Sequence, residues 1–338
     1  MSLNHPSVAI VGATGAVGCE LIACLEQRDF PLRELRLFAS ARSVGRRLLF
    51  RRDGIPVQEL QDGALDGTDI ALLSAGSATA RQFAPDAVRQ GTIVVDNSSA
   101  FRMDPGVPLV VPEVNGGTIA GHRGIIANPN CVAIIAAVPL WPLHREIGIA
   151  RVVAATYQAA SGGGAAAMAE LRSATGAYLA GKEFTPRVLR HPYAFNLFSH
   201  DTAVDAETGA NDEETKVVRE LRKIMQAPSL PIGITCIRVP VLRAHSIALT
   251  VELARPVSPA DARRILGDAP GIQIVDDPEH NHFPMPVEAT GQGDVLVGRI
   301  RRDGSDPSGR SLAMFVAGDQ LLKGAALNAV QIAEMLVK

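Results

Sequence analysis

The sequence predicts an α/β protein whose N-terminal part forms a doubly wound parallel sheet. A short apolar run, residues 8–11, leads directly into a glycine-rich turn and then into a helical pattern. Segments of helical length, such as residues 78–90, separate later apolar runs, as in sheets whose parallel strands are joined by crossover helices. Four of these later runs are short and apolar enough to be buried strands; they are residues 35–39, 70–73, 93–96 and 124–127.

Length and composition favour a soluble enzyme-sized chain of two domains. The chain has 338 residues, of which 47% are hydrophobic and 20% charged, enough to bury large cores. The net charge of −2 and the absence of a basic block argue against nucleic acid as a partner. The longest apolar stretch, residues 131–143, contains two prolines and is too short to cross a bilayer, so we expect no membrane partner.

The cysteines and the N-terminus indicate a cytoplasmic protein. The four cysteines form no CxxC pair and have no histidine-rich spacing, so we expect neither a disulfide framework nor a metal site. The N-terminus lacks the basic region and long apolar core of a signal peptide.

The glycine-rich turn has the features of a dinucleotide site. Its glycines allow the backbone to approach a pyrophosphate, and the helix that follows directs its N-terminus at the phosphates. The pattern GxxGxxG is a variant of the usual GxGxxG, and its position between strand and helix is what makes it specific. A tight turn without a ligand is the alternative. The candidate cofactor-binding residues here are Gly12, Thr14, Gly15, Ala16, Val17 and Gly18.

The end of the second strand favours NADP(H) over NAD(H). A site selective for NAD usually places Asp or Glu there, to bind the ribose 2′-hydroxyl. Here the chain continues with Ser40, Ala41, Arg42 and Ser43, whose hydroxyls and guanidinium can hold a 2′-phosphate. A solvated arginine on a loop is the alternative.

Three polar clusters follow the later strands, at residues 74–77, 97–102 and 128–131. Ligands of doubly wound sheets bind beyond the carboxyl ends of the strands. Arg102, in the second cluster, is therefore expected to point into the same cleft as Cys131, in the third.

Cys131 is the candidate nucleophile. Pro129 should end the preceding strand, and Asn130 can cap the apolar helix that follows. Cys131 then lies in the first turn of that helix, where the helix dipole favours a thiolate. A buried structural cysteine is the alternative.

The second half alternates strands with helices. A strand at residues 151–158 enters a glycine-rich loop, which is either a second anion cradle or a turn, and then a helix at 165–178. Residues 182–210 have weak periodicity and receive no firm assignment. A final amphipathic helix is expected at 321–336, long enough to dock on another domain.

Several charged or polar residues in this half are candidates for a site. Asn211 or Asp212 caps a helix in which Glu213 and Lys216 share one face, although a solvated capping segment is the simpler interpretation. Arg238 lies inside an apolar strand and needs a partner anion. His245, at the entry of another strand, can act as a base near neutral pH.

Assembled, these motifs resemble the aspartate-semialdehyde dehydrogenase family over nearly the whole chain. The matching segments are GATGAVG (12–18), DNSSAFRM (96–103), VVPEVN (110–115), ANPNC (127–131), TYQAASG (156–162), EETK (213–216), TCIRVP (235–240) and VGRIRRD (297–303). The resemblance implies a Rossmann-type NADP-binding domain, residues 1–130 with a C-terminal helix at 318–338. It also implies an α+β catalytic and dimerisation domain with a mixed sheet, residues 131–317, and a homodimer, with a homotetramer as the alternative.

The resemblance also implies an activity. The family reduces L-4-aspartyl phosphate with NADPH to L-aspartate 4-semialdehyde, in the synthesis of diaminopimelate, lysine, methionine and threonine. Cys131 would form the acyl-enzyme thioester, His245 would be the general acid/base, and Gln158 would orient the acyl group. The remaining implied roles are Arg238 for the substrate carboxylate, Glu213 for its amino group, Arg102 and Lys216 for phosphate, Asn130 beside the nucleophile, and Ser74, Ser161, Gly162 and Gln320 for the cofactor.

Some positions depart from the family pattern. Val132 follows the cysteine where a small polar residue is usual, Ala244 replaces a glycine before His245, and Gln320 stands where asparagine is common. Two other functions stay open. One is N-acetyl-glutamyl-phosphate reductase, which shares the thioester chemistry, and the other is a binding protein that keeps the fold without catalysis.

Overall fold

The computed structural model describes residues 3–337 and divides into two compact units. Unit 1 comprises Met1–Asn130 and Ala325–Lys338, and unit 2 comprises Cys131–Gly324. The chain thus returns to unit 1 at Ala325 rather than at residue 318. Within unit 2, the Asp319 carboxylate accepts a hydrogen bond from the backbone N–H of Gly291 at 2.7 Å.

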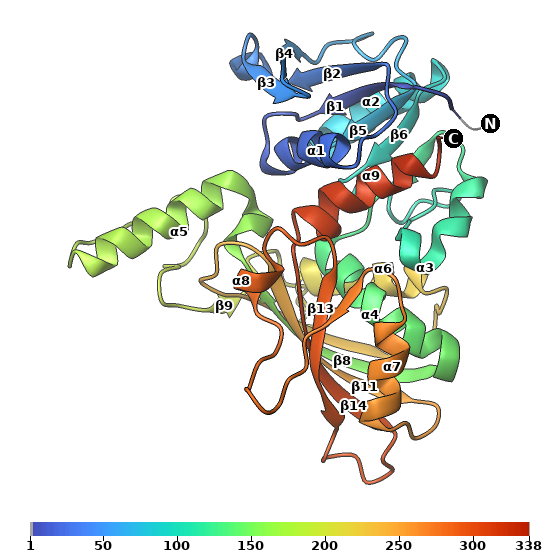
Figure 1. Ribbon diagram of the computed structural model, residues 1–338. Coiled ribbons are helices and arrows are strands. Elements are labelled where there is room, and N and C mark those ends of the chain that lie inside the picture. The colour runs from blue at the N-terminus through green and yellow to red at the C-terminus, as the bar shows by residue number, and fades with distance from the viewer. Residues whose placement is uncertain (1–2, 338) are drawn as a thin grey trace. The chain divides into compact units, whose positions relative to one another are not determined.

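Unit 1 is built on a seven-stranded sheet of order β3-β4-β2-β1-β5-β6-β7 (Figure 1). All neighbouring strands pair in parallel except β3 and β4, so the doubly wound sheet is mixed at one edge. The strands are β1 (Ser7–Val11), β2 (Glu34–Ala39), β3 (Arg47–Phe50), β4 (Asp53–Glu59), β5 (Ile70–Leu73), β6 (Ile93–Asp96) and β7 (Ile125–Ala127). Its helices are α1 (Ala16–Gln27), α2 (Ser77–Arg89), α3 (Pro112–Asn115) and α9 (Leu327–Glu334).

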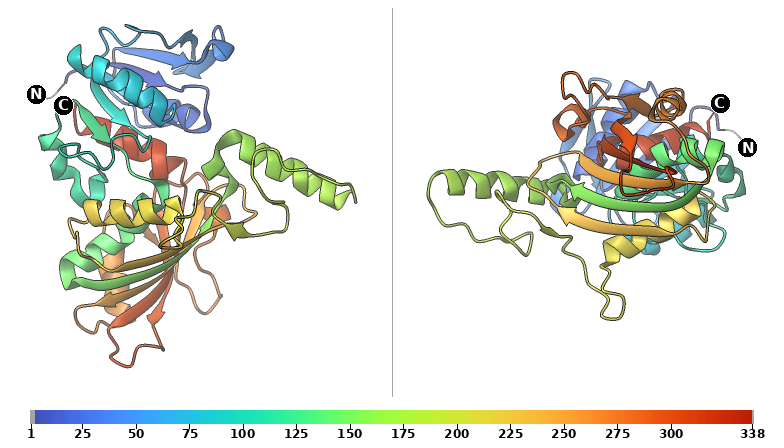
Figure 2. Two further views of the ribbon diagram at one scale, coloured as in Figure 1. Left: turned by 180° about the vertical axis from the view of Figure 1, so that it is seen from behind. Right: turned by 90° about the horizontal axis from the view of Figure 1, so that it is seen from below.

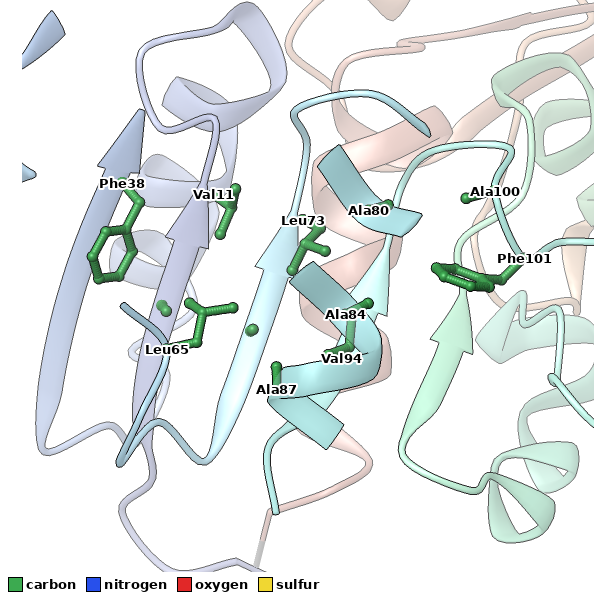
Figure 3. Close-up of a cluster of buried hydrophobic side chains, with 12 residues drawn as sticks. Val11, Phe38, Leu65, Leu73, Ala80, Ala84, Ala87, Val94, Ala100 and Phe101 are labelled. Carbon is green, nitrogen blue, oxygen red and sulfur yellow. The ribbon is translucent and has the colours of Figure 1, made fainter. Parts of the chain in front are cut away.

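Helices cover both faces of this sheet. On one face, small residues of α2 (Ala80, Ala84 and Ala87) let the helix lie close to the apolar side chains of the strands (Figure 3). Helices α1 and α9 lie on the other face, in front of the strands in Figure 1. An ion pair between Arg28 and Glu334, 2.6 Å long, joins the ends of these two helices. The sheet core is therefore buried from both sides, which accounts for the unbroken apolar runs of its strands.

Unit 2 contains a second seven-stranded mixed sheet, of order β12-β13-β14-β11-β8-β10-β9. Its strands are β8 (Ile149–Gln158), β9 (Phe198–Ser199), β10 (Ile232–Arg238), β11 (His245–Leu253), β12 (Ile272–Ile274), β13 (Val295–Arg302) and β14 (Ser311–Gly318). Its helices are α4 (Cys131–Ile147), α5 (Gly164–Leu179), α6 (Asp212–Ile224), α7 (Pro259–Gly267) and α8 (Pro286–Ala289).

Helices α4, α6 and α7 lie against one face of this sheet, and α5 extends away from it (Figures 1 and 2). The opposite face carries apolar side chains. Along β8, Val153 and Tyr157 are 42% and 37% exposed, whereas their neighbours Val152 and Thr156 are buried on the helix side. The Tyr157 and Phe315 rings lie 6.0 Å apart on this outer face.

The structure differs from the sequence prediction at the final helix and adds detail elsewhere. Helix α4 continues through Pro139 and Pro142 to Ile147. The expected helix at 321–336 is instead a π-helical turn, Leu322–Ala326, followed by α9. Strands β3, β4, β9, β12 and β14 and helices α3, α7 and α8 received no sequence prediction.

Over residues 3–337, no helix is long and apolar enough to cross a membrane. The same residues contain no cluster of three or more His, Cys, Asp or Glu side chains arranged for a metal ion.

Candidate active site

Cys131 is the first residue of α4, as its position after Asn130 predicted. The π-helical turn packs directly on it. A Cβ atom added to Gly324 would lie 3.0 Å from the Cys131 Cβ and 3.2 Å from the Gln320 Cβ. A larger residue at position 324 would therefore have to push the cysteine or Gln320 aside. The start of a seventeen-residue helix favours an anion at this position.

Register across the sheet of unit 2 places the other candidate residues in one row. Arg238, the last residue of β10, pairs with Gln158, the last residue of β8. His245, the first residue of β11, pairs with Gly318 at the end of β14, and the adjacent Ser246 pairs with Tyr157. Because β11 runs antiparallel to β8, the start of one meets the end of the other. The side chains of Gln158, Arg238 and His245 therefore lie at the same end of three neighbouring strands.

Contacts within unit 2 connect this row to Cys131. The Gln320 side-chain oxygen accepts from the backbone N–H of Ala244 at 2.9 Å, immediately before His245. A Cβ atom at Gly324 would touch the Cβ atoms of both Gln320 and Cys131, so these two residues are neighbours. The charge of Cys131 also contributes to raising the pKa of Cys236 on β10, after the larger effect of burial. Cys131 and the polar residues at the ends of β8, β10 and β11 therefore lie close to one another.

Several buried polar atoms in and near this row have no hydrogen-bond partner among the described residues. They are Ser161 Oγ, Tyr193 Oη, Arg238 Nε, His245 Nε2 and Gln320 Nε2; Ser246 Oγ also lacks a partner but lies on the outer face of the sheet, with Tyr157 opposite it on β8. Orphaned buried polar atoms are rare in folded proteins because each costs free energy, and a cluster of them at one place indicates a missing polar ligand. Most of these atoms are hydrogen-bond donors, so they suit an anionic ligand.

Gly162 lies beside two of these residues, Arg238 and His245. A Cβ atom at this position would be 3.0 Å from Arg238 Nη1 and 3.2 Å from His245 Nε2. The glycine-rich loop thus folds as a short 3₁₀ turn, Ala160–Gly163, that brings backbone close to a guanidinium and an imidazole. This arrangement favours the anion-cradle interpretation of the loop over a plain turn.

The imidazole of His245 is fully buried and neutral near pH 7. Burial lowers its pKa well below the usual value, and the nearby charges of Arg238 and His200 lower the pKa further. The backbone N–H of Ala159 donates to Nδ1 at 3.0 Å. One ring nitrogen is therefore held by the fold and the other faces the cluster around Gly162.

A buried polar chain fixes the amide of Gln158. The Thr156 hydroxyl donates to the Gln158 oxygen at 3.0 Å, and the Gln158 amide nitrogen donates to the Glu213 carboxylate at 3.2 Å. Glu213 is buried, so the solvated-segment interpretation is wrong for this residue. Its position follows from a capping box in which Asn211 and Glu214 bond each other's backbone, as the sequence predicted for Asn211. Thr156 was not predicted as a site residue.

Segment 182–210 also contributes to the site. Asp201 lies 3.5 Å from Arg238 Nε, which supplies the partner anion expected for that arginine. The Tyr193 hydroxyl is buried near both, and burial raises the pKa of Tyr193 to about 12. Neither Tyr193 nor Asp201 was predicted, because the surrounding sequence has no periodic pattern to place them.

The predicted site residues divide between the two units. Unit 2 holds Cys131, Gln158, Ser161, Gly162, Glu213, Lys216, Arg238, His245 and Gln320, and unit 1 holds Arg102, Asn130 and the glycine-turn residues. Lys216 lies one turn after Glu213 on α6. Arg102 is buried, and its guanidinium donates to the carbonyls of Asn128 and Asn97 at 3.0 and 2.8 Å. It is thereby fixed at the carboxyl ends of β6 and β7.

Unit 1 contains a cavity of about 530 Å³ at the carboxyl ends of β1, β2 and β5. Gly12, with φ +87°, lies against Ser74 so closely that a Cβ atom would collide with the Ser74 carbonyl. The Thr14 hydroxyl lies 3.2 Å from that of Ser43, joining the glycine turn to the 3₁₀ turn Ala41–Ser43. Gly12, Thr14, Gly15, Ser40 and Ser74 all line the cavity, whereas Arg42 is exposed beside it.

One carboxylate in this cavity was missed. Glu59, at the end of the unpredicted strand β4, pairs with Ala39 at the end of β2 and lines the cavity. The sequence has no acidic residue directly after β2, where one is usual in NAD sites. The carboxylate comes instead from the adjacent strand β4, twenty residues further along the chain. The Glu59 carboxylate accepts from the Gln61 amide at 3.0 Å.

Comparisons with known proteins agree with this arrangement. Residues 7–122 match the family model for the NAD binding domain of semialdehyde dehydrogenases, and residues 140–323 match the model for their dimerisation domain. A protein from Synechocystis named aspartate-semialdehyde dehydrogenase is 51% identical over 98% of this chain and 97% of its own length. One of the same name from Aquifex aeolicus is 47% identical over 98% of both chains.

A solved structure has the same fold along the entire chain. Aspartate semialdehyde dehydrogenase II from Vibrio cholerae, complexed with ASA, superposes with a TM-score of 0.95 at 39% identity. The match covers 99% of this chain and 98% of that one. With matches of this identity and coverage in both units, the chain belongs to the aspartate-semialdehyde dehydrogenase family of oxidoreductases.

Proposed function

We propose that this chain reduces L-4-aspartyl phosphate to L-aspartate 4-semialdehyde with NADPH, through a thioester on Cys131. The observation that carries the proposal is the cluster of orphaned polar atoms around Gly162, beside a cysteine that begins a buried helix. In the synthetic direction the Cys131 thiolate attacks the acyl carbonyl, the carbon–sulfur bond forms, and the bond to phosphate breaks. Its product serves the synthesis of diaminopimelate, lysine, methionine and threonine.

The charges of the site suit this substrate. Arg238, with unsatisfied donor capacity at Nε, binds the substrate carboxylate, and the buried Glu213 carboxylate binds its ammonium group. Gln158, held by Thr156, orients the acyl group through its amide. Arg102 and Lys216 bind the phosphate, Asn130 supports the nucleophile, and His245 supplies the acid–base group.

Glu213 distinguishes this substrate from an N-acetylated one. An acetylated nitrogen is uncharged, so a buried carboxylate facing it would lose its cationic partner and cost free energy. This argues against N-acetyl-glutamyl-phosphate reductase activity. A binding protein without catalysis is disfavoured because it has no need for a helix-start cysteine next to an unsatisfied buried imidazole.

Unit 1 has the features that NADP(H) requires. The cavity lies against the glycine turn, where a Cβ at Gly12 would close the approach, and hydroxyls of Ser40 and Ser43 lie near its rim with Arg42. These groups would hold the pyrophosphate and the 2′-phosphate. In unit 2, Ser161, Gly162 and Gln320 would face the nicotinamide. The cofactor supplies the hydride that reduces the thioester.

We further propose that the chain acts as a cytoplasmic homodimer. The support is the apolar outer face of the sheet in unit 2, where Val153 and Tyr157 are 42% and 37% exposed and the rings of Tyr157 and Phe315 lie 6.0 Å apart. A homotetramer is the alternative, and light scattering on the purified protein distinguishes the two states. Residues 1–130 with the C-terminal helix serve as the nucleotide domain, and the intervening residues carry catalysis and dimerisation.

The test is phosphate-dependent formation of NADPH from aspartate semialdehyde. Wild-type protein should show this activity and should not use N-acetyl-glutamate semialdehyde. Cys131→Ser should lose at least about a thousandfold in kcat, because an alcohol is a far weaker nucleophile than a thiolate. Cys24→Ala, which removes a buried thiol of α1, is the matched control and should stay active. Undiminished turnover by Cys131→Ser would contradict the mechanism.

A further inference from the structure

We propose that the hydroxyl of Tyr193 is a further substrate-binding group, which donates a hydrogen bond to the carboxylate that Arg238 binds. The proposal rests on the proposed function and adds one residue to its site. Tyr193 would thereby help to select a substrate with a free α-carboxylate.

Apolar packing holds the ring of Tyr193 in one place. The side chain is only 1% exposed, and its ring lies edge-on to that of Phe198, with 5.5 Å between the ring centroids. It shares an apolar cluster with Ala160, which opens the glycine-rich turn that borders Arg238. The ring is therefore fixed against a loop of the substrate site.

Contacts on both sides of Tyr193 fix the segment that carries it. Before the tyrosine, the Glu170 carboxylate on α5 accepts a hydrogen bond from the backbone N–H of Leu189 at 3.0 Å. After it, Phe198 of β9 pairs with Arg238 of β10. The backbone around Tyr193 is thus anchored to the same strand that carries the arginine.

The hydroxyl of Tyr193 is buried without a hydrogen-bond partner among residues 3–337. A buried tyrosine hydroxyl usually has one. Burial raises the pKa of Tyr193 to about 12, and the charges of Arg238 and Asp201 have smaller, opposite effects on that pKa. The hydroxyl is therefore protonated at neutral pH, is able to donate, and lies within the electrostatic reach of the guanidinium.

Arg238 leaves part of its guanidinium for a ligand. Its Nη1 donates to the Ala159 carbonyl at 3.2 Å, and its Nε lies 3.5 Å from the Asp201 carboxylate without a hydrogen bond to it. Asp201 satisfies neither the arginine Nε nor the Tyr193 hydroxyl. A ligand carboxylate has two acceptor oxygens and a negative charge, so it can accept from the guanidinium and the phenol together.

The unpartnered hydroxyl has a consequence for the free protein. A buried donor without a partner destabilises the fold, and a hydrogen bond to a ligand carboxylate would offset that cost. The proposal therefore predicts that removal of the hydroxyl weakens substrate binding without lowering the stability of the free protein. A hydroxyl with a purely structural role would do the opposite.

Tyr193→Phe removes the hydroxyl and keeps the ring. We expect KM for L-aspartate semialdehyde to rise about 10- to 100-fold, as for loss of a hydrogen bond to a charged group, with kcat within about threefold of wild type. The midpoint of urea denaturation of the free protein should be unchanged or higher. Tyr178→Phe, at an exposed position of α5, is the matched control and should change none of these values. Lower stability of Tyr193→Phe with a wild-type KM would overturn the proposal.

Carbon NMR of protein labelled with ¹³C at the tyrosine Cζ observes the hydroxyl-bearing carbon without turnover. The chain has three tyrosines, Tyr157, Tyr178 and Tyr193, so Tyr193→Phe assigns the signal of interest. L-aspartate semialdehyde added to cofactor-free protein should shift the Tyr193 signal, whereas 3-aminopropanal, the same aldehyde without the carboxylate, should not. Absence of this shift, or equal shifts with both aldehydes, would overturn the proposal. Wild-type protein that shows the shift but forms no NADPH would contradict the proposed function alone.

Discussion

Replacing Thr156 by valine tests whether a residue outside the predicted site positions Gln158. Valine has nearly the shape of threonine but no hydroxyl, so the change removes the hydrogen bonds of that hydroxyl, to the Gln158 amide and to the Cys236 thiol, without opening a cavity. Thr156 is fully buried and donates to the Gln158 oxygen at 3.0 Å. The Gln158 nitrogen donates in turn to Glu213 at 3.2 Å.

The expected loss follows from the burial of both partners. A buried carbonyl left without its donor costs about 1–3 kcal/mol. If the Gln158 amide stays in place, this cost appears as lower stability. If the amide rotates so that its oxygen reaches another donor, its nitrogen also loses the hydrogen bond to Glu213 and the acyl-binding geometry is lost. We expect rotation, and a decrease in kcat/KM of about 5- to 150-fold from the same free energy.

Steady-state kinetics and urea denaturation separate the two results. Thr156→Ser keeps the hydroxyl and serves as the matched control, so its kcat/KM should stay within about threefold of wild type, the usual context-dependence of such terms. Thr156→Val should raise KM for aspartate semialdehyde and lower kcat. Loss of stability in Thr156→Val with wild-type kinetics would refute the positioning role and leave a purely structural one.

Three further predictions concern the loop, the cofactor cavity and pH. Gly162→Ala should lower kcat/KM by about a hundredfold, because its Cβ would displace the guanidinium and imidazole beside it. Gly176→Ala, in open space on α5, should leave activity unchanged and stabilise the fold by about 0.5–1 kcal/mol in urea denaturation. Arg42→Ala should raise KM for NADP about tenfold and KM for NAD little, whereas Glu59→Gln should not weaken NADP binding; equal losses with both cofactors would contradict the assignment. Burial lowers the folded-state pKa of His245, so below about pH 6.5 the unfolded chain binds a proton at this residue that the folded chain does not. The free energy of unfolding should therefore decrease as the pH is lowered, by up to about 1.4 kcal/mol per pH unit. His245→Gln should flatten that dependence.

Local signals in the sequence identified the parts of the site that depend on neighbours in the chain. The glycine turn, the helix that starts at Cys131 and the Asn211 capping box each follow from a few adjacent residues. Arg238 was recognisable because a charge inside an apolar strand requires a partner.

Contacts between distant segments were beyond the sequence. Segment 182–210 is held by the buried Glu170 carboxylate, which accepts from the backbone N–H groups of Arg187, Val188 and Leu189. Nothing periodic marks these residues, so the position of Asp201 beside Arg238 could not be predicted. Glu59 was missed for a similar reason, since only the pairing of β4 with β2 brings it to the nucleotide cavity. The final helix was predicted as one piece because packing of Gly324 on Cys131, which accompanies the π-helical turn, leaves no periodic signature.

The most direct test of the account is to trap the acyl group on Cys131. Protein mixed with L-4-aspartyl phosphate in the absence of NADPH, quenched in acid and digested, should yield one aspartyl thioester on the peptide that contains Cys131. Phosphate should be released in equal amount, and added NADPH should discharge the thioester to the aldehyde. Release of phosphate without an adduct, or an adduct on Cys236 instead, would contradict the central claim that Cys131 is the nucleophile.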